Sequence, residues 1–151
     1  MNNKRLLDFG CGQGDFYPFI KKIYPKVKYT GIDINPRFVN VAQKRFPKAK
    51  FRVGTTSDIK NSYDYIVCSG VFSFTVDNYW KLLCKSIAAL YSKSKIALGF
   101  NLLELGKHID NEIYVTYNKD KVIKHCNNLS NKVKLIDGYL DYDFTTILYK
   151  R

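Results

Sequence analysis

A short apolar strand that runs directly into a glycine-rich loop is the feature that most constrains this chain. Residues 5–9 form the expected strand, and glycine then stands at every second position, at Gly10, Gly12 and Gly14. Glycine allows a tight turn and lets a ligand lie against the main chain. An amphipathic helix is expected next, and Asp33 follows a second apolar stretch nineteen residues beyond Gly14. This order predicts a mononucleotide-binding half of an open α/β fold.

The spacing of the loop distinguishes between cofactors. A dinucleotide fingerprint would place its third glycine at position 15, which is Asp15, whereas the third glycine here is Gly14. Asp8 and Asp15 flank the loop and would repel a pyrophosphate. S-adenosylmethionine carries a sulfonium and an ammonium group and no phosphate, so the two acids favour it. For Asp15 itself we favour a plainer role, as a first-turn acid that complements the helix dipole.

These residues resemble the class I S-adenosylmethionine-dependent methyltransferases. The first motif of that family is Asp-x-Gly-x-Gly-x-Gly after an apolar strand, which the chain matches with Asp8 and the three glycines. The resemblance implies that Asp33 binds both ribose hydroxyls and that Ile34 packs on the adenine. It also implies methyl transfer from S-adenosyl-L-methionine, with S-adenosyl-L-homocysteine as product.

Three further cofactor contacts are predicted. Cys11 lies inside the loop and would contribute at most a backbone amide. Asp58 follows the third expected strand, where the family often places a polar group against the adenine amino group. Thr55 or Thr56 fits that place as well, and a plain turn is an equal alternative. Ser69, at the end of the fourth strand, completes the predicted set.

Strands and helices alternate along the whole chain. The expected strands are 5–9, 28–34, 51–54, 63–69, 95–101, 132–140 and 143–150, with helices after the loop and at about 36–46, 78–90 and 119–129. This alternation predicts an α/β fold with a mostly parallel sheet, helices on both faces and one reversed strand from the closing hairpin. The resemblance implies a three-layer, Rossmann-like sheet of seven strands in the order 3-2-1-4-5-7-6. We expect residues 1–151 to form a single domain.

The first two helices are predicted from apolar residues at helical spacing. Asn35 and Pro36 read as an N-cap and a first helical position. The residues expected to face the core are Phe16, Phe19, Ile20 and Ile23 in the first helix, and Phe38, Val41, Ala42 and Phe46 in the second.

Composition restricts the class of protein further. Apolar residues make up 46% of the chain, which is enough for a full core. The four cysteines show no C-x-x-C pairing, so we expect no metal site and no disulfide framework. There is no apolar run of membrane-spanning length and no signal-peptide pattern. We expect a soluble, cytoplasmic protein.

The methyl acceptor is expected beyond the end of the fourth strand. The predicted pocket is formed by Gly70 and Phe72, with Asn101 and His108 after the fifth strand. This segment is not the Asn/Asp-Pro-Pro-Tyr/Phe of amino-directed nucleic-acid methyltransferases, and Cys68 lacks the proline of the cytosine C5 type. His108 is either a base or, as we favour, a surface loop residue. The sequence assigns no catalytic residue.

The net charge of +12 raises the question of nucleic acid. Residues 21–52 contain ten basic residues and one acid, on the cofactor side of the expected sheet. This segment either grips nucleic acid or is a solvated surface, which we favour. The predicted function is therefore methyl transfer to a small molecule. The alternatives are an RNA methyltransferase that uses the basic face and a non-catalytic cofactor-binding subunit that needs a partner. The sequence leaves the oligomeric state open.

Overall fold

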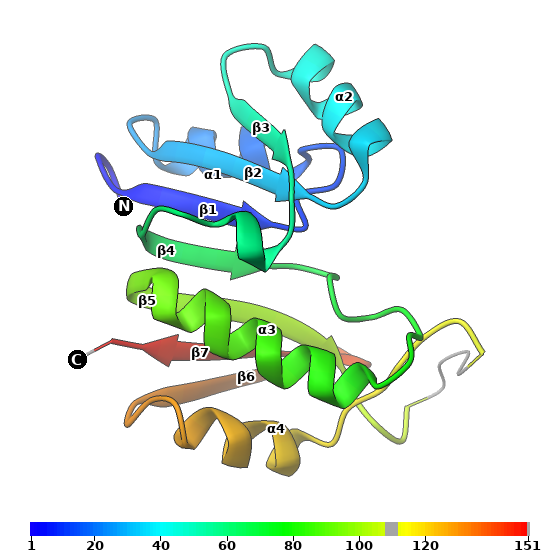
Figure 1. The fold of residues 1–151 in the computed structure, drawn as a ribbon. Helices are drawn as coiled ribbons and strands as arrows, with labels where there is room; N and C mark the ends of the chain where they lie inside the picture. Colours follow the sequence, from blue (N-terminus) through cyan, green and yellow to red (C-terminus); the bar gives the residue numbers. More distant parts are fainter. Residues whose placement is uncertain (108–111, 151) are drawn as a thin grey trace.

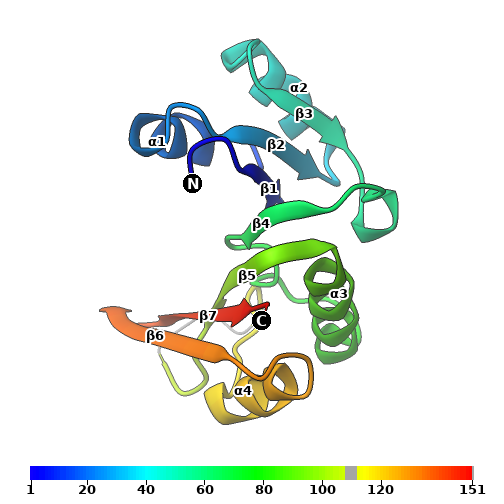
Figure 2. The same ribbon diagram turned by 90° about the vertical axis from the view of Figure 1, so that its left-hand side faces the viewer.

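The computed structural model describes residues 1–107 and 112–150, which contain one seven-stranded sheet with helices on both faces (Figures 1 and 2). The strand order is β3-β2-β1-β4-β5-β7-β6, so the predicted order is confirmed. The β3 to β5 pairs are parallel, and β7 lies antiparallel to both β5 and β6. The strands are β1 (Arg5–Phe9), β2 (Lys28–Asp33), β3 (Lys50–Val53), β4 (Tyr63–Cys68), β5 (Ser94–Leu103), β6 (Val133–Leu140) and β7 (Asp143–Tyr149).

Four α-helices and one short 3-10 helix connect the described strands. Asn35 caps the second helix as predicted, because its side chain accepts a hydrogen bond from the Arg37 amide at 2.9 Å. Asn118 caps the last helix in the same way, through the Lys121 amide at 2.9 Å. The helices are α1 (Phe16–Ile23), α2 (Pro36–Arg45), η1 (Thr56–Asp58), α3 (Tyr79–Lys93) and α4 (Lys119–Asn127).

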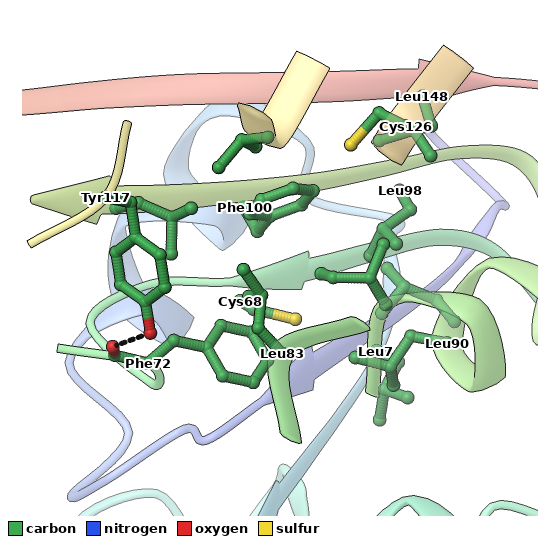
Figure 3. Packing of buried hydrophobic residues seen from close by; sticks show 14 of the residues in the cluster. Leu7, Cys68, Phe72, Leu83, Leu90, Leu98, Phe100, Tyr117, Cys126 and Leu148 are labelled. Carbon is green, nitrogen blue, oxygen red and sulfur yellow. Dashed lines mark hydrogen bonds between the residues drawn. The ribbon is translucent and has the colours of Figure 1, made fainter. Parts of the chain in front are cut away.

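The sheet separates two hydrophobic cores. Helices α1 and α2 cover one face and α3 and α4 cover the other (Figure 2). Alternation along β1 sends Leu6 to the first core and Leu7 to the second, and both side chains are fully buried. The larger core lies under α3 and α4, where Leu83 and Phe100 pack together with Cys68 (Figure 3).

The predicted buried stripes of α1 and α2 are partly wrong. Phe19 is 59% exposed and Phe38 is 41% exposed, and Ile23 also faces solvent. The predicted residues Ile20 and Ala42 are buried against the sheet, and Val39, which was not predicted, is buried with them. The space between these helices and the sheet is filled by an aromatic cluster of Tyr17, Tyr29, Phe46 and Phe51, with ring centroids 5.1 to 6.4 Å apart. Tyr17 takes the inward position of α1 that the spacing assigned to Phe19.

No helix in residues 1–107 or 112–150 is both long and apolar enough to cross a membrane.

Candidate active site

The glycine loop lies at the carboxyl end of β1 and turns tightly against β2. The amides of Gly10 and Cys11 both donate to the Ile32 carbonyl, at 2.7 and 3.0 Å. Gly10, Gly12 and Gly14 all have positive φ angles, at 75°, 52° and 82°, which residues other than glycine rarely adopt. The three sequence-predicted glycines are therefore required by the backbone itself.

The surroundings of these glycines differ in a way that points to a ligand. A Cβ on Gly10 would lie 2.3 Å from Val71 Cγ2, and one on Gly14 would lie 2.9 Å from the Phe51 ring. Close packing explains both. A Cβ on Gly12 would meet no atom within 4 Å. Bare backbone that faces open space at Gly12 is the surface a cofactor would use.

Asp33 closes β2 and is joined directly to the loop. Its Oδ2 accepts a hydrogen bond from the Gly12 amide and its Oδ1 accepts one from the Asn35 amide, both at 2.8 Å. A carboxylate has about four lone-pair sites, so each oxygen keeps one for a further donor. The residue is 9% exposed. This geometry leaves Asp33 able to accept hydrogen bonds from two ribose hydroxyls while it holds the loop in place.

Asp8 is a buried carboxyl just before the loop. It is 3% exposed, and its Oδ2 accepts a hydrogen bond of 2.6 Å from the Tyr29 hydroxyl. Burial raises the pKa of Asp8 from 3.8 to about 6; the Tyr29 hydrogen bond lowers it and the charge of Asp33 raises it. Asp8 and Asp33 repel each other beside the bare backbone of the loop. A positively charged ligand would reduce this repulsion, and a pyrophosphate would add to it.

An apolar surface adjoins this acidic pair. Ile34 follows β2 and is 73% exposed, and Val53 ends β3 and is 50% exposed. Asp33 and Val53 are partners in the β2–β3 register, so the two apolar side chains lie at the same end of the sheet as the Asp33 carboxylate. A flat aromatic base could bury both side chains.

The other predicted cofactor contacts are placed less favourably. The Cys11 amide already donates a hydrogen bond to the Ile32 carbonyl, and the Cys11 carbonyl accepts one from the Gly14 amide at 2.9 Å. Burial raises the pKa of the Cys11 thiol to about 12, which makes it unreactive. Asp58 binds the Thr55 amide at 2.8 Å in a capping box, which lowers its pKa. Ser69 is exposed directly after β4.

A polar network marks the predicted acceptor end. The Gly70 amide donates to Asn101 Oδ1 at 2.8 Å, and Asn101 Nδ2 donates to Asp143 Oδ2 at 2.7 Å. Asp143 is 7% exposed, and its Oδ1 has no partner among the described residues. The predicted residues Gly70 and Asn101 are thus brought together at the carboxyl ends of β4 and β5.

The other two predicted pocket residues are Phe72 and His108. Phe72 is 7% exposed, and its ring lies in the core beside Leu83, so the expectation that its side chain lines an open pocket is corrected (Figure 3). The Tyr117 hydroxyl holds the Phe72 carbonyl at 2.8 Å, which fixes the segment (Figure 3). His108 lies outside the described residues.

Two loops meet beyond the carboxyl end of β5 (Figure 1). The Val115 amide donates to the Ser73 carbonyl at 2.9 Å, and the Phe74 and Tyr114 rings pack with centroids 5.6 Å apart. Phe74 is 59% exposed and Ile113 is 51% exposed. The rim of the predicted acceptor end is therefore apolar and aromatic.

Asp143 is the residue that the sequence reasoning missed. A usable signal was present: β7 runs antiparallel to β5, so its first residue must lie beside the carboxyl end of β5. Asp143 is that first residue, and it is the partner of Leu103 in the register. A polar residue at the start of the reversed strand is thus placed at the site by topology alone.

The fold and the site define a class I S-adenosylmethionine-dependent methyltransferase domain. Residues 7–93, more than half of the chain, match the family model described as "Methyltransferase domain". The chain belongs to this family.

Individual curated proteins are similar to this chain over most of its length. An uncharacterized protein of Methanocaldococcus jannaschii is 27% identical over 92% of this chain and 40% of its own length. A demethylmenaquinone methyltransferase of Thermotoga maritima is 25% identical over 79% of this chain and 53% of its own length. The chain thus spans about half the length of these curated relatives, or less.

A solved structure shows the same fold at low identity. The magnesium protoporphyrin IX methyltransferase of Synechocystis, with bound S-adenosylhomocysteine, superimposes with a TM-score of 0.79 and is 13% identical. The match covers 99% of this chain and 75% of that protein.

Proposed function

We propose that this chain is an S-adenosylmethionine-dependent methyltransferase that acts on a small molecule, with residues 1–151 as one domain. The observation that carries the proposal is the pair of acids at the loop, Asp8 and Asp33, beside the open backbone of Gly12. Asp33 would accept the ribose hydroxyls, Ile34 would cover the adenine, and Asp8 would offset the positive charge of the cofactor.

S-adenosylmethionine, when bound, supplies a methyl group that is transferred by in-line displacement. The contribution of the chain is mainly to hold the acceptor in line with that group. The network of Gly70, Asn101 and Asp143 would do this. The buried Asp143 Oδ1 has no hydrogen-bond partner among the described residues, so an acceptor hydroxyl or amine that reaches it would supply one. The residue can also take up the proton that such a group loses.

A small, largely apolar acceptor fits the rim of the site. The exposed side chains of Phe74 and Ile113 offer aromatic and aliphatic surface. Two similar proteins bear names that specify such acceptors, a demethylmenaquinone methyltransferase and a magnesium protoporphyrin IX methyltransferase. These points support a small organic acceptor over a nucleobase.

Calorimetry with S-adenosylmethionine tests the cofactor site. Asp33→Ala should weaken binding by about 1–3 kcal/mol, because the ribose hydroxyls lose their acceptor. Asp15→Ala is the matched control: this acid also lies beside the loop, but it is exposed and paired with Arg45 at 2.7 Å, so its removal should leave affinity unchanged. Equal affinities for wild type and Asp33→Ala would place the cofactor elsewhere.

Release of S-adenosylhomocysteine tests the acceptor class. We expect turnover with members of a panel of quinols, phenols and amines, and none with bulk RNA. Turnover on RNA alone would favour a nucleic-acid methyltransferase. Tight cofactor binding without turnover on any member would favour a subunit that depends on a partner.

A further inference from the structure

Two adjoining cavities lie at the amino-terminal edge of the sheet, opposite the glycine loop. Their volumes are about 560 and 340 Å³, and they share Arg5, Thr30, Ala49 and Lys50. We call them together the basic cavity. Its lining includes six cationic side chains, and none of its described lining residues is acidic; the cations are Arg5, Lys21, Lys28, Lys48, Lys50 and Arg52.

The topology of the sheet gathers these charges. Arg5, Lys28 and Lys50 are the first residues of β1, β2 and β3, which are neighbouring parallel strands. Arg5 and Lys28 are direct partners in the register. The glycine loop follows the opposite end of β1, and a five-residue strand is about 16 Å long. The first residues of these strands are therefore a strand's length from the cofactor site, whereas Arg52, the register partner of Ile32, lies nearer to it.

One cation in the cavity lacks the partners that burial requires. The Arg52 Nε and Nη2 atoms are buried and have no hydrogen-bond acceptor among the described residues. Buried donors of a charged group are costly when they are unpaired. Because these atoms have almost no accessible surface, the guanidinium would have to turn toward the cavity for an anion there to supply the missing acceptors. A guanidinium matches the geometry of phosphate oxygens.

The acids nearest to the cavity are already engaged. Asp64 accepts a hydrogen bond from the Arg5 amide at 2.7 Å and lies 3.9 Å from the Lys4 ammonium. Asp58, whose charge interacts with Arg52, is held by the Thr55 amide and hydroxyl at 2.8 and 3.0 Å. These carboxylates offset part of the positive charge without lining the cavity.

We propose that the basic cavity binds the phosphate backbone of a single nucleic-acid strand. Six cations spread over two joined cavities exceed what one phosphate group can contact, so a ligand with several phosphates fits best. Four aromatic residues also line the cavities. Tyr29, Phe51 and Tyr63 are 6%, 7% and 4% exposed, and Arg5 covers the Tyr63 ring at 4.9 Å. Tyr17 is half-buried, and its ring packs against Tyr29 and Phe46 at centroid distances of 5.1 and 5.3 Å. Since these rings are engaged within the fold, binding should not depend on base stacking or on sequence.

Fluorescence anisotropy with a labelled 12-nucleotide oligouridylate tests the proposal. Affinity should fall steeply between 50 and 300 mM salt, with a slope of log K against log salt of about −2 to −4 for three to six phosphate contacts. An oligocytidylate of the same length should bind equally, and inorganic pyrophosphate should compete only weakly. Competition by pyrophosphate as strong as that of the oligomer would overturn the proposal in favour of a small anion site.

Two triple variants separate the cavity from net charge. Lys28→Gln/Lys48→Gln/Lys50→Gln removes three cavity lysines that are exposed and whose ammonium groups make no hydrogen bond or ion pair with the described residues. The control, Lys81→Gln/Lys85→Gln/Lys95→Gln, removes the same charge from exposed positions on α3 and β5. We expect the first variant to weaken binding about tenfold or more at 0.1 M salt and the control to change it little.

Equal losses in the two variants, or no oligonucleotide binding by wild type at 50 mM salt, would overturn the inference. Arg52→Gln adds a separate test, since it removes the buried unpaired donors. This inference does not depend on the proposed function. Affinity for S-adenosylmethionine should be unchanged in all of these variants, so failure of one idea is distinguishable from failure of the other.

Discussion

The buried carboxyl of Asp8 should give the free energy of unfolding an unusual pH dependence. Its pKa is about 6 in the folded protein against an ordinary value of 3.8. Between these values the folded state binds more protons than the unfolded state, so the free energy of unfolding falls as pH rises. At about 1.4 kcal/mol per pKa unit, the ionised carboxyl costs about 3 kcal/mol once the pH is well above 6. Below pH 4 this cost disappears.

Asp8→Asn removes the titration and keeps the shape of the side chain. Its amide oxygen can still accept the Tyr29 hydroxyl. Urea unfolding at intervals from pH 4 to pH 8 should show wild type losing up to about 3 kcal/mol relative to the variant. Asp15→Asn, at an exposed acid, should follow the wild-type profile. Parallel profiles for wild type and Asp8→Asn would refute the reasoning.

The same group should make cofactor binding depend on pH. A positive cofactor favours ionised Asp8, so affinity for S-adenosylmethionine should rise with pH through about 6. Tyr29→Phe removes a hydrogen bond that lowers this pKa, so it should move the midpoint to higher pH. Calorimetry across pH 5 to 8 measures both effects, and a flat profile would show that Asp8 does not interact with the cofactor's charge.

Further substitutions separate packing from binding. Gly12→Ala should cost about 1–2 kcal/mol of stability from its φ of 52°, and it should abolish cofactor binding measured by calorimetry because its Cβ enters the open space beside the loop. Gly10→Ala should lower the unfolding midpoint more, because its Cβ would also meet Val71 at 2.3 Å; an equal loss would contradict this comparison. Asn101→Ala removes the acceptor of the Gly70 amide and the amide donor to the buried Asp143 carboxylate and should cost about 1–3 kcal/mol, so an unchanged urea midpoint would show the network to be dispensable.

Local signals along the chain predicted the kind of sheet, and the resemblance to the methyltransferase family supplied the order of its strands. Alternating strands and helices indicate parallel pairing, and the closing hairpin around Asp141 gives the reversed strand. The glycine loop and Asp33 were found for a related reason. Positive φ at Gly10 and Gly12 and a strand-end acid are constraints that residue types reveal directly.

Features that depend on packing between distant segments were missed. The spacing of α1 allowed either Phe19 or Tyr17 to face the sheet, and only the aromatic rings of other elements decide for Tyr17. Phe72 follows β4 as predicted, but the Tyr117 hydroxyl from a distant segment fixes its carbonyl and its ring enters the core. Asp143 lies at the site because of the strand order. That order was predicted, but its consequence for the position of Asp143 was not.

The positive charge of the chain is best understood by its position. The cofactor is itself positive, so a net charge of +12 would disfavour its binding if the charge acted uniformly. It does not act uniformly, because the acids Asp8 and Asp33 lie at the carboxyl end of the strands and the basic cavity lies at the amino end. A separation of about 16 Å along β1 exceeds the screening length of about 10 Å at 0.1 M salt. The two ends of one sheet can therefore hold ligands of opposite charge. Raising the salt concentration should lower the affinity for a phosphate ligand far more than the affinity for the cofactor.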